Sequence, residues 1–343
     1  MVTLMKKHKE RIIKASNKIA RNSLARSEAT VKRTIISVVC VFIIALLVVP
    51  PIIIVHLITS GHVDYGVIEN HPLQNIYSPS DFGLTAKEMM LTTEDGYNVW
   101  ASEVYTENPK AVIIYLSGIQ QPSVTYYYGH AKWMRDNGYA SFLLEVRGHG
   151  KSDGDRVCLG YEEVSDVKAV VDYIKRQKYY ADVPIVIQGV SMGGSIAINA
   201  FGQIEDISGL IAASAYSSFE DVVADTMRSY RIPGFVRAIE RPLIQLSLRF
   251  TFGDKVNELV PIKQVQNIGG RPALFIASVR DEQVSSENMT RLLAAAPEHC
   301  ISWLRDEETA GHFIMLNYDF ENIALDTEYC KRVLSFLENE VLK

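Results

Sequence analysis

The sequence contains little cysteine, with four residues among 343. Cys40 lies in an apolar run, whereas Cys158, Cys300 and Cys330 are far apart, and their spacing is not typical of a metal site or a dense disulfide framework. We therefore expect buried free thiols, and a disulfide from Cys158 to Cys300 or Cys330 is the alternative.

The sequence also lacks internal repeats, low-complexity segments and any basic stripe interleaved with aromatic residues, so nucleic acid is not an expected partner. Its charge is instead divided along the chain. Residues 1–34 hold ten Lys or Arg against two Glu, a net charge of +8, and the remainder carries −13 of the total −5. This division indicates a basic segment at an anionic membrane surface, as an amphipathic helix or a flexible cytosolic tail, and an acidic soluble body.

Residues 35–58 form an almost uninterrupted apolar run that contains His56 and is long enough to cross a hydrocarbon core. Pro50 and Pro51 are expected to kink or shorten this helix, because proline donates no backbone hydrogen bond. We predict a retained signal-anchor in the cell membrane, with the N-terminus in the cytoplasm and the body on the far side. A cleaved secretory signal is the alternative.

Residues 59–86 are glycine- and proline-containing and are expected to be a linker and lead-in, followed by a folded domain over 87–343. Within that domain apolar strands alternate with periodic helices, which predicts an α/β fold with a mostly parallel sheet and helices on both faces. The expected strands include 88–93, 98–105, 111–116, 141–146, 207–214, 272–278 and 300–304.

The alternation is interrupted over 216–261 by apolar stretches that Pro233, Gly234, Pro242 and Gly253 separate. This stretch is expected to be a small helical lid suited to an apolar acyl or aryl group, or else helices that simply pack on the sheet. Three consecutive tyrosines, Tyr126 to Tyr128, are expected to pack in the core or to line the mouth of a site.

The most informative stretch is 183–197, an apolar strand, a sharp turn and a helix opened by small residues. Gly189, Ser191 and Gly193 match the G-x-S-x-G pattern of a nucleophile elbow. The glycines let strand and helix approach closely while the serine oxygen stays exposed at the turn. The helix also directs its N-terminal N–H groups and positive dipole end at the same place, which suits an oxyanion.

From about Lys87 to its C-terminus the chain resembles the α/β-hydrolase superfamily of serine hydrolases, including its membrane-tethered and esterase-like members. The resemblance is carried by the elbow and by the segments Ser117-Gly118-Ile119-Gln120, Arg147-Gly148-His149-Gly150-Lys151-Ser152-Asp153-Gly154, Asp281 after a strand, and Gly311-His312. It implies the α/β-hydrolase fold and a structural role for the loop that contains His149.

In this superfamily the catalytic residues follow in the order serine, acid, histidine, and Ser191, Asp281 and His312 obey that order. Asp281 lies shortly after the strand 273–278, where Glu282 and Asp306 are competing acids. His312 follows a glycine in a loop between the last strand and the last helix, a position that neither His130 nor His299 shares.

The same resemblance assigns the two oxyanion donors to the backbone N–H groups of Ile119 and Met192. Ser117 stands where the superfamily usually has histidine, a difference that concerns the loop's internal hydrogen bonds and not the donors.

These observations lead to one expected function, a membrane-anchored serine hydrolase that cleaves a carboxylic ester, thioester or lipid acyl group and needs no metal or organic cofactor. Its partners are then a small-molecule or lipid acyl substrate and the membrane. A peptidase that removes N-terminal residues and an inactive tethered scaffold are the two alternatives.

Overall fold

A computed structural model describes residues 1–63, 73, 75–119, 121–316 and 320–343. Residues 64–72 and 74 of the expected lead-in over 59–86, together with Gln120, therefore lie outside the described residues. The chain divides into two compact units, Met1–Ile53 and Ile54–Lys343.

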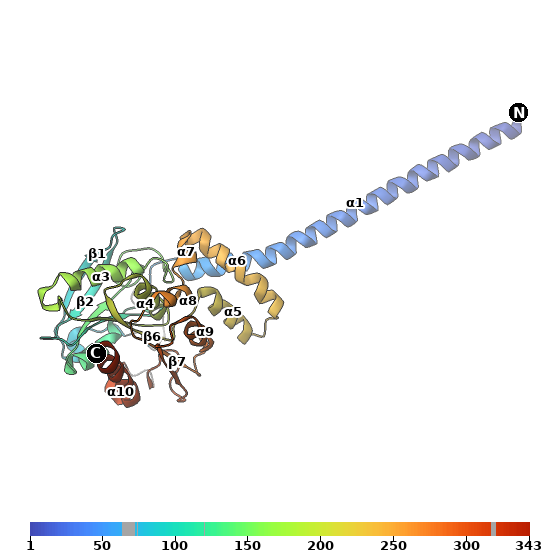
Figure 1. Cartoon of the computed structure of the whole chain (residues 1–343). Coiled ribbons are helices and arrows are strands. Elements are labelled where there is room, and N and C mark those ends of the chain that lie inside the picture. Colours follow the sequence, from blue (N-terminus) through green and yellow to red (C-terminus); the bar gives the residue numbers. More distant parts are fainter. Residues whose placement is uncertain (64–72, 74, 120, 317–319) are drawn as a thin grey trace. The chain divides into compact units, whose positions relative to one another are not determined.

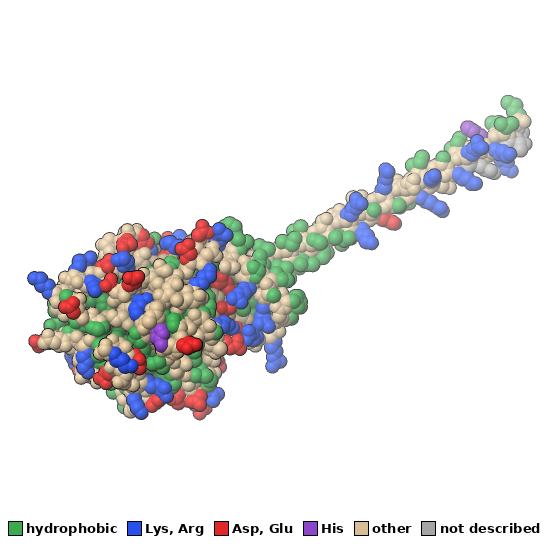
Figure 2. All heavy atoms as spheres, viewed as in Figure 1, with side chains coloured by type: hydrophobic (Ala, Val, Ile, Leu, Met, Phe, Trp, Pro, Cys, Tyr) green, Lys and Arg blue, Asp and Glu red, His purple; other side chains and the backbone are tan. Residues whose placement is uncertain are grey.

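The first unit consists of most of helix α1 (Val2–Thr59). Its basic side chains lie on the turns nearest the N-terminus, and the following turns present an apolar surface (Figure 2). The helix is long and apolar enough to cross a membrane, with a mean hydropathy of 3.3 over its most apolar window.

Pro50 and Pro51 were expected to kink or shorten the helix. They do not shorten it, because α1 continues through both to Thr59. Its last turns belong to the second unit, where Val55 is buried in the core and its carbonyl accepts a 2.8 Å hydrogen bond from the Thr59 hydroxyl. This burial stabilises the turns that follow the prolines.

The second unit is built on one eight-stranded sheet, in the order β1-β2-β4-β3-β5-β6-β7-β8. β2 pairs antiparallel with β1 and β4, and every other neighbouring pair is parallel. The strands are β1 (Lys87–Thr92), β2 (Asn98–Val104), β3 (Val112–Leu116), β4 (Ala140–Leu144), β5 (Ile185–Val190), β6 (Ile207–Ala213), β7 (Ala273–Ser278) and β8 (Ile301–Arg305). The mostly parallel α/β sheet expected from the sequence is confirmed.

Helices cover both faces of this sheet (Figure 1). Alternate residues of β3 show the division, since Ile114 faces one hydrophobic core and Ile113 faces the other. α3, α4 and α9 bury side chains in the first core, and α2 and α10 bury theirs in the second. The bounds are α2 (Tyr128–Asp136), α3 (Val164–Arg176), α4 (Met192–Gln203), α9 (Glu287–Ala295) and α10 (Thr327–Phe336), the last continued by a π-helical turn η7 (Leu337–Val341). Short 3-10 turns are η1 (Pro79–Phe82), η2 (Thr125–Tyr127), η3 (Lys178–Tyr180), η4 (Val265–Asn267) and η6 (Ile323–Leu325).

Between β6 and β7 the chain forms α5 (Phe219–Ser229), α6 (Gly234–Phe252), α7 (Lys255–Glu258) and α8 (Pro261–Gln264). Pro242 was expected to separate two apolar stretches, but α6 runs through it. The proline is exposed, while Ile244 and Leu248 are buried in the same core as side chains of α4.

Two further expectations are settled by burial. Tyr126, Tyr127 and Tyr128 are each at most 3% exposed and pack in the second core, so they do not line a mouth. Cys158, Cys300 and Cys330 are free thiols, so the alternative disulfide does not form; Cys158 and Cys330 are buried as expected, whereas Cys300 is half-buried.

Candidate active site

Ser191 occupies the turn between β5 and α4. Its backbone conformation, φ 57° and ψ −122°, is one that residues other than glycine rarely adopt. Its N–H donates to the carbonyl of Ala213 at the end of β6, 2.9 Å away. This hydrogen bond holds the strained turn that places Ser191 just beyond the end of β5, as the G-x-S-x-G pattern requires.

The two glycines of the pattern are needed for steric reasons. A Cβ on Gly189 would lie 2.2 Å from the Gly193 carbonyl oxygen, and a Cβ on Gly193 would lie 2.4 Å from the Ser117 carbonyl oxygen. Both contacts involve backbone, which cannot rotate away. The glycines therefore set how closely the strand, the helix and the loop after β3 approach one another.

Replacing Gly189 by alanine is expected to lower the free energy of unfolding by about 3 kcal/mol, because the new methyl group overpacks the start of α4. Gly270 offers a matched control, since a Cβ there meets nothing within 4 Å. Denaturant midpoints of the G189A and G270A variants check this, and equal midpoints would contradict the steric account.

The loop after β3 passes directly over the serine. A Cβ on Gly118 would lie 3.2 Å from Ser191 Cβ, and the Gly118 N–H donates to Gln121 Oε1 at 3.0 Å. The structure thus brings the loop that contains Ile119 against the turn where Met192 begins α4. The first N–H groups of a helix have no partner within it, which leaves the Met192 N–H directed at the turn.

Asp281 and His312 are adjacent and buried. His312 Nδ1 lies 2.8 Å from Asp281 Oδ2 and 3.0 Å from Oδ1, with the two side chains 4% and 1% exposed. Asp281 Oδ1 also accepts the N–H groups of Gln283 and Val284 at 2.9 and 2.8 Å. A carboxylate that accepts all these bonds orients a ring whose Nδ1 is the donor, and this tautomer leaves Nε2 as a proton acceptor.

The competing acids lie elsewhere. Glu282 and Asp306 are exposed. His149 is buried and its Nδ1 lies 3.2 Å from the Arg147 carbonyl, which fits the structural role expected of its loop. His130 is buried among aromatic rings and His299 is exposed.

Two serines that the sequence analysis did not single out fix the backbone around this pair. The Ser214 hydroxyl donates to the His312 carbonyl at 2.6 Å, and the Ser278 hydroxyl donates to the Ala310 carbonyl. Both serines directly follow or end a buried strand, β6 or β7, and that position is the signal that could have identified them.

The end of β6 also connects the two halves of the site. Ala213 accepts the N–H of Ser191, and the next residue, Ser214, holds the backbone of His312. In the described residues the Ser191 hydroxyl makes no hydrogen bond to the His312 ring. Such bonds are often long in ligand-free enzymes and tighten when substrate binds.

A surface hollow of about 650 Å³ adjoins Asp281, between α5 and the start of α9. Its acidic residues Asp225 and Glu287 are paired with arginines: Arg291 lies 2.7 Å from Asp225, and Arg228 lies 2.6 Å from Glu287. Glu282 also lines the hollow and is exposed. In the part of the chain that the structure describes, no cluster of three or more His, Cys, Asp or Glu could hold a metal ion.

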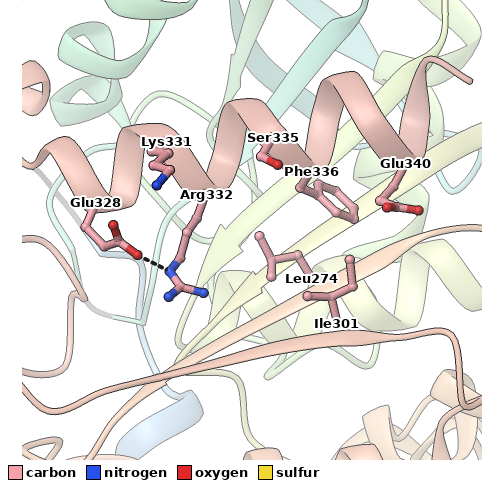
Figure 3. Close-up of a pocket in the computed structure, with 8 residues that line it drawn as sticks. All are labelled: Leu274, Ile301, Glu328, Lys331, Arg332, Ser335, Phe336 and Glu340. Carbon is pink, nitrogen blue, oxygen red and sulfur yellow. Dashed lines mark hydrogen bonds and ion pairs between the residues drawn. The ribbon is translucent and has the colours of Figure 1, made fainter.

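A second hollow, of about 310 Å³, lies between α10 and the sheet (Figure 3). Leu274 and Ile301 line it from the beginnings of β7 and β8, and the Glu328–Arg332 ion pair lies at its other end. In α/β sheets ligands bind at the carboxyl ends of the strands, where Ser191, Asp281 and His312 lie, so this hollow is not part of the candidate site.

A family model described as "Serine aminopeptidase, S33" matches residues 107–257. The chain is 26% identical over 188 residues to the uncharacterized protein YqkD of Bacillus subtilis, covering 51% of this chain and 60% of that protein. It is 23% identical over 163 residues to protein bem46 of Schizosaccharomyces pombe, covering 44% and 51%. The chain thus spans little more than half the length of the curated relatives it matches.

Two solved structures are similar in fold. The Pyrococcus furiosus esterase Pf2001 has a TM-score of 0.61 at 22% identity, covering 82% of this chain and 99% of the esterase. The Pyrococcus horikoshii acylaminoacyl peptidase has a TM-score of 0.58 at 15% identity, covering 76% of this chain and 42% of the peptidase. At these identities the likeness concerns the fold.

Proposed function

This chain has the α/β-hydrolase fold, and we propose that it is a membrane-anchored serine hydrolase that cleaves a carboxylic ester, thioester or lipid acyl group. The observation that carries the proposal is the buried Asp281–His312 pair, whose backbone is held by the same strand end that holds Ser191. A serine hydroxyl needs such a base, and the base needs an orienting acid.

The proposed reaction has two steps. In the first, Ser191 Oγ attacks the carbonyl carbon while His312 Nε2 accepts the hydroxyl proton, and the protonated ring then gives that proton to the leaving alcohol or thiol. In the second, His312 takes a proton from water as the water attacks the acyl-enzyme, and the ring returns it to Ser191 as the acid leaves. Asp281 keeps the ring oriented and stabilises its charged form throughout.

The oxyanion of each step is assigned to the backbone N–H groups of Ile119 and Met192. The close approach of the Gly118 backbone to Ser191 supports this assignment, as does the start of α4 at Met192. Donors of this kind are worth about 3–4 kcal/mol each in the transition state, because they are oriented before the charge develops.

Membrane anchoring is part of the proposal and rests on α1, with its apolar run over 35–58 and its basic first turns. The excess of Lys and Arg before the run favours a cytoplasmic N-terminus and a catalytic unit on the other side. Extraction of membranes with alkaline carbonate distinguishes a retained anchor from a cleaved secretory signal, since the protein stays in the membrane pellet only if it keeps the helix.

A serine aminopeptidase is the second candidate, favoured by the matched family model and by the exposed Glu282 in the hollow beside Asp281. A substrate amine needs a counter-charge, and the arginines that pair with Asp225 and Glu287 leave little negative charge there. This balance favours the ester hydrolase.

A panel of p-nitrophenyl esters of graded acyl length, run beside aminoacyl amides on the full-length chain, tests the proposal. We expect turnover of the esters, slow or no turnover of the amides, and labelling of Ser191 by a fluorophosphonate probe. Faster turnover of the amides would select the aminopeptidase. Absence of both turnover and labelling in a folded sample would select the inactive scaffold.

A further inference from the structure

Arg305, the last residue of β8, is fully buried although it carries a charge. Its guanidinium makes five hydrogen bonds, as many as it has N–H groups: two to Asp326, two to Glu307 and one to the Ile314 carbonyl. Asp326 is buried as well, and its carboxylate lies 2.7 Å from the guanidinium. A buried ion pair adds little net stability, because both charges lose their hydration. The pair therefore calls for a further role.

One of these hydrogen bonds acts on the loop that contains His312. Ile314 lies two residues after His312 and has a φ of 69°, a conformation that a β-branched residue keeps only where its surroundings enforce it. Arg305 Nη1 donates to the Ile314 carbonyl at 2.9 Å, and Asp326 Oδ2 accepts the N–H of Leu316 at 3.2 Å. The Arg305–Asp326 pair thus holds the strained backbone directly after the candidate base.

The backbone of the same arginine contacts the loop of the candidate acid. The Arg305 carbonyl accepts the N–H of Val279, two residues before Asp281, at 2.9 Å. Arg305 is therefore bonded to the Asp281 loop through its backbone and to the His312 loop through its side chain. The 2.8 Å separation of Asp281 Oδ2 from His312 Nδ1 depends on where both loops lie.

We propose that Arg305 is a positioning residue that keeps His312 in register with Asp281, with Asp326 as its counter-charge. The inference rests on the proposed function, because that function makes His312 the base. Arg305 acts through the backbone of Ile314 and does not touch the substrate. Without the guanidinium the strained backbone relaxes and carries the ring with it, and a misplacement of about 1 Å can lower a rate by about 100-fold.

The test is the double variant R305M/D326N in the full-length chain. Methionine keeps an apolar side chain against Trp303, on which the guanidinium stacks at 4.5 Å. Asparagine keeps Oδ1 as the acceptor for the Tyr329 N–H at the start of α10, and no buried charge is left unpaired. We expect kcat for a p-nitrophenyl ester to fall by about 100-fold while KM stays within about threefold, because a misplaced base affects the chemical step.

Arg332→Met is the matched control. Arg332 stacks on the other side chain contact of Arg305, Trp303, at 4.7 Å, but it is exposed and donates to Glu328 on its own helix. It makes no hydrogen bond to the His312 loop in the described residues. We expect R332M to keep kcat within about twofold, which separates loss of the hydrogen bond to Ile314 from loss of an arginine on the tryptophan.

A second measurement reports on the register without catalysis. The Nδ1 proton that His312 shares with Asp281 gives a proton resonance far downfield of the amide region. We expect this resonance in the unchanged chain and in R332M, and its loss or broadening in R305M/D326N at a temperature well below the thermal midpoint. Loss of stability alone does not move it in a sample that remains folded.

The outcomes distinguish this inference from the proposed function. If R305M/D326N keeps kcat within threefold, or keeps the sharp resonance, the positioning role is overturned and the hydrolase stands. If the unchanged chain shows neither turnover nor labelling, the hydrolase fails, and the resonance alone decides the positioning role. If the double variant does not fold, R305K replaces it: lysine keeps the charge but not the planar set of donors, so kcat is expected to fall by about tenfold, and an unchanged kcat would overturn the role.

Discussion

Replacing Ser191 by alanine is expected to lower turnover of a short-chain p-nitrophenyl ester by at least about 10⁴-fold, because no other group can form the acyl-enzyme. The remaining activity would come from the oxyanion donors and from substrate binding. The fold should survive, since alanine keeps the backbone hydrogen bond from position 191 to Ala213 and removes only the hydroxyl. Alanine is also small enough for the turn.

Ser229→Ala supplies the control. Ser229 lies exposed on α5, where its hydroxyl donates to the Thr226 carbonyl, and its loss should leave turnover within about twofold of the unchanged chain. Turnover is read with the thermal midpoint of each variant, so that a loss of activity is assigned to chemistry only where the midpoint is kept. Undiminished turnover by a folded S191A variant would falsify the assignment of the nucleophile.

The elbow was predictable because its geometry depends on short-range sterics. Positions 189 and 193 require glycine because a Cβ there would lie 2.2 or 2.4 Å from a backbone carbonyl oxygen. The apolar strand before them marks where the turn begins. The location of Asp281 was predictable for a related reason, because the ends of parallel strands meet at one edge of the sheet.

What the sequence did not indicate depends on contacts between distant residues. Ser214 and His312 are 98 positions apart, and nothing near either residue in the sequence states that a hydroxyl at the end of β6 holds that loop. The same applies to the route of the chain through Pro242 and through Pro50 and Pro51, where burial of the following turns outweighs the local preference of proline.

Helix α6 illustrates a third case. The apolar residues over 243–252 predicted part of a helical lid, or else a helix packed on the sheet, and the inner side of α6 is buried in the first core. The hydrophobic pattern alone did not reveal that apolar residues cover the outer side too while Glu240 is buried. Only the exposure of each side chain separates the two faces of such a helix.

Replacing Asp281 by asparagine is expected to lower kcat by about 10⁴-fold with little change in stability. Asparagine can keep Oδ1 as the acceptor for the N–H groups of Gln283 and Val284, so the loop keeps its turn. Its amide nitrogen then takes the place of Oδ2, 2.8 Å from His312 Nδ1, and donates where the carboxylate accepted. The ring must move its proton to Nε2, and it can no longer accept the proton of Ser191.

The competing acids, Glu282 and Asp306, provide matched controls for this variant. Glu282→Gln and Asp306→Asn make the same chemical change, carboxylate to amide, at exposed positions. Each is expected to keep kcat within about twofold, since neither removes a hydrogen bond to the base. Measuring kcat and KM for all three separates the effects further. Loss of orientation at the base lowers kcat, whereas loss of a substrate contact raises KM. A large fall in kcat for E282Q or D306N, with D281N unaffected, would move the acid to another residue and break the proposed triad.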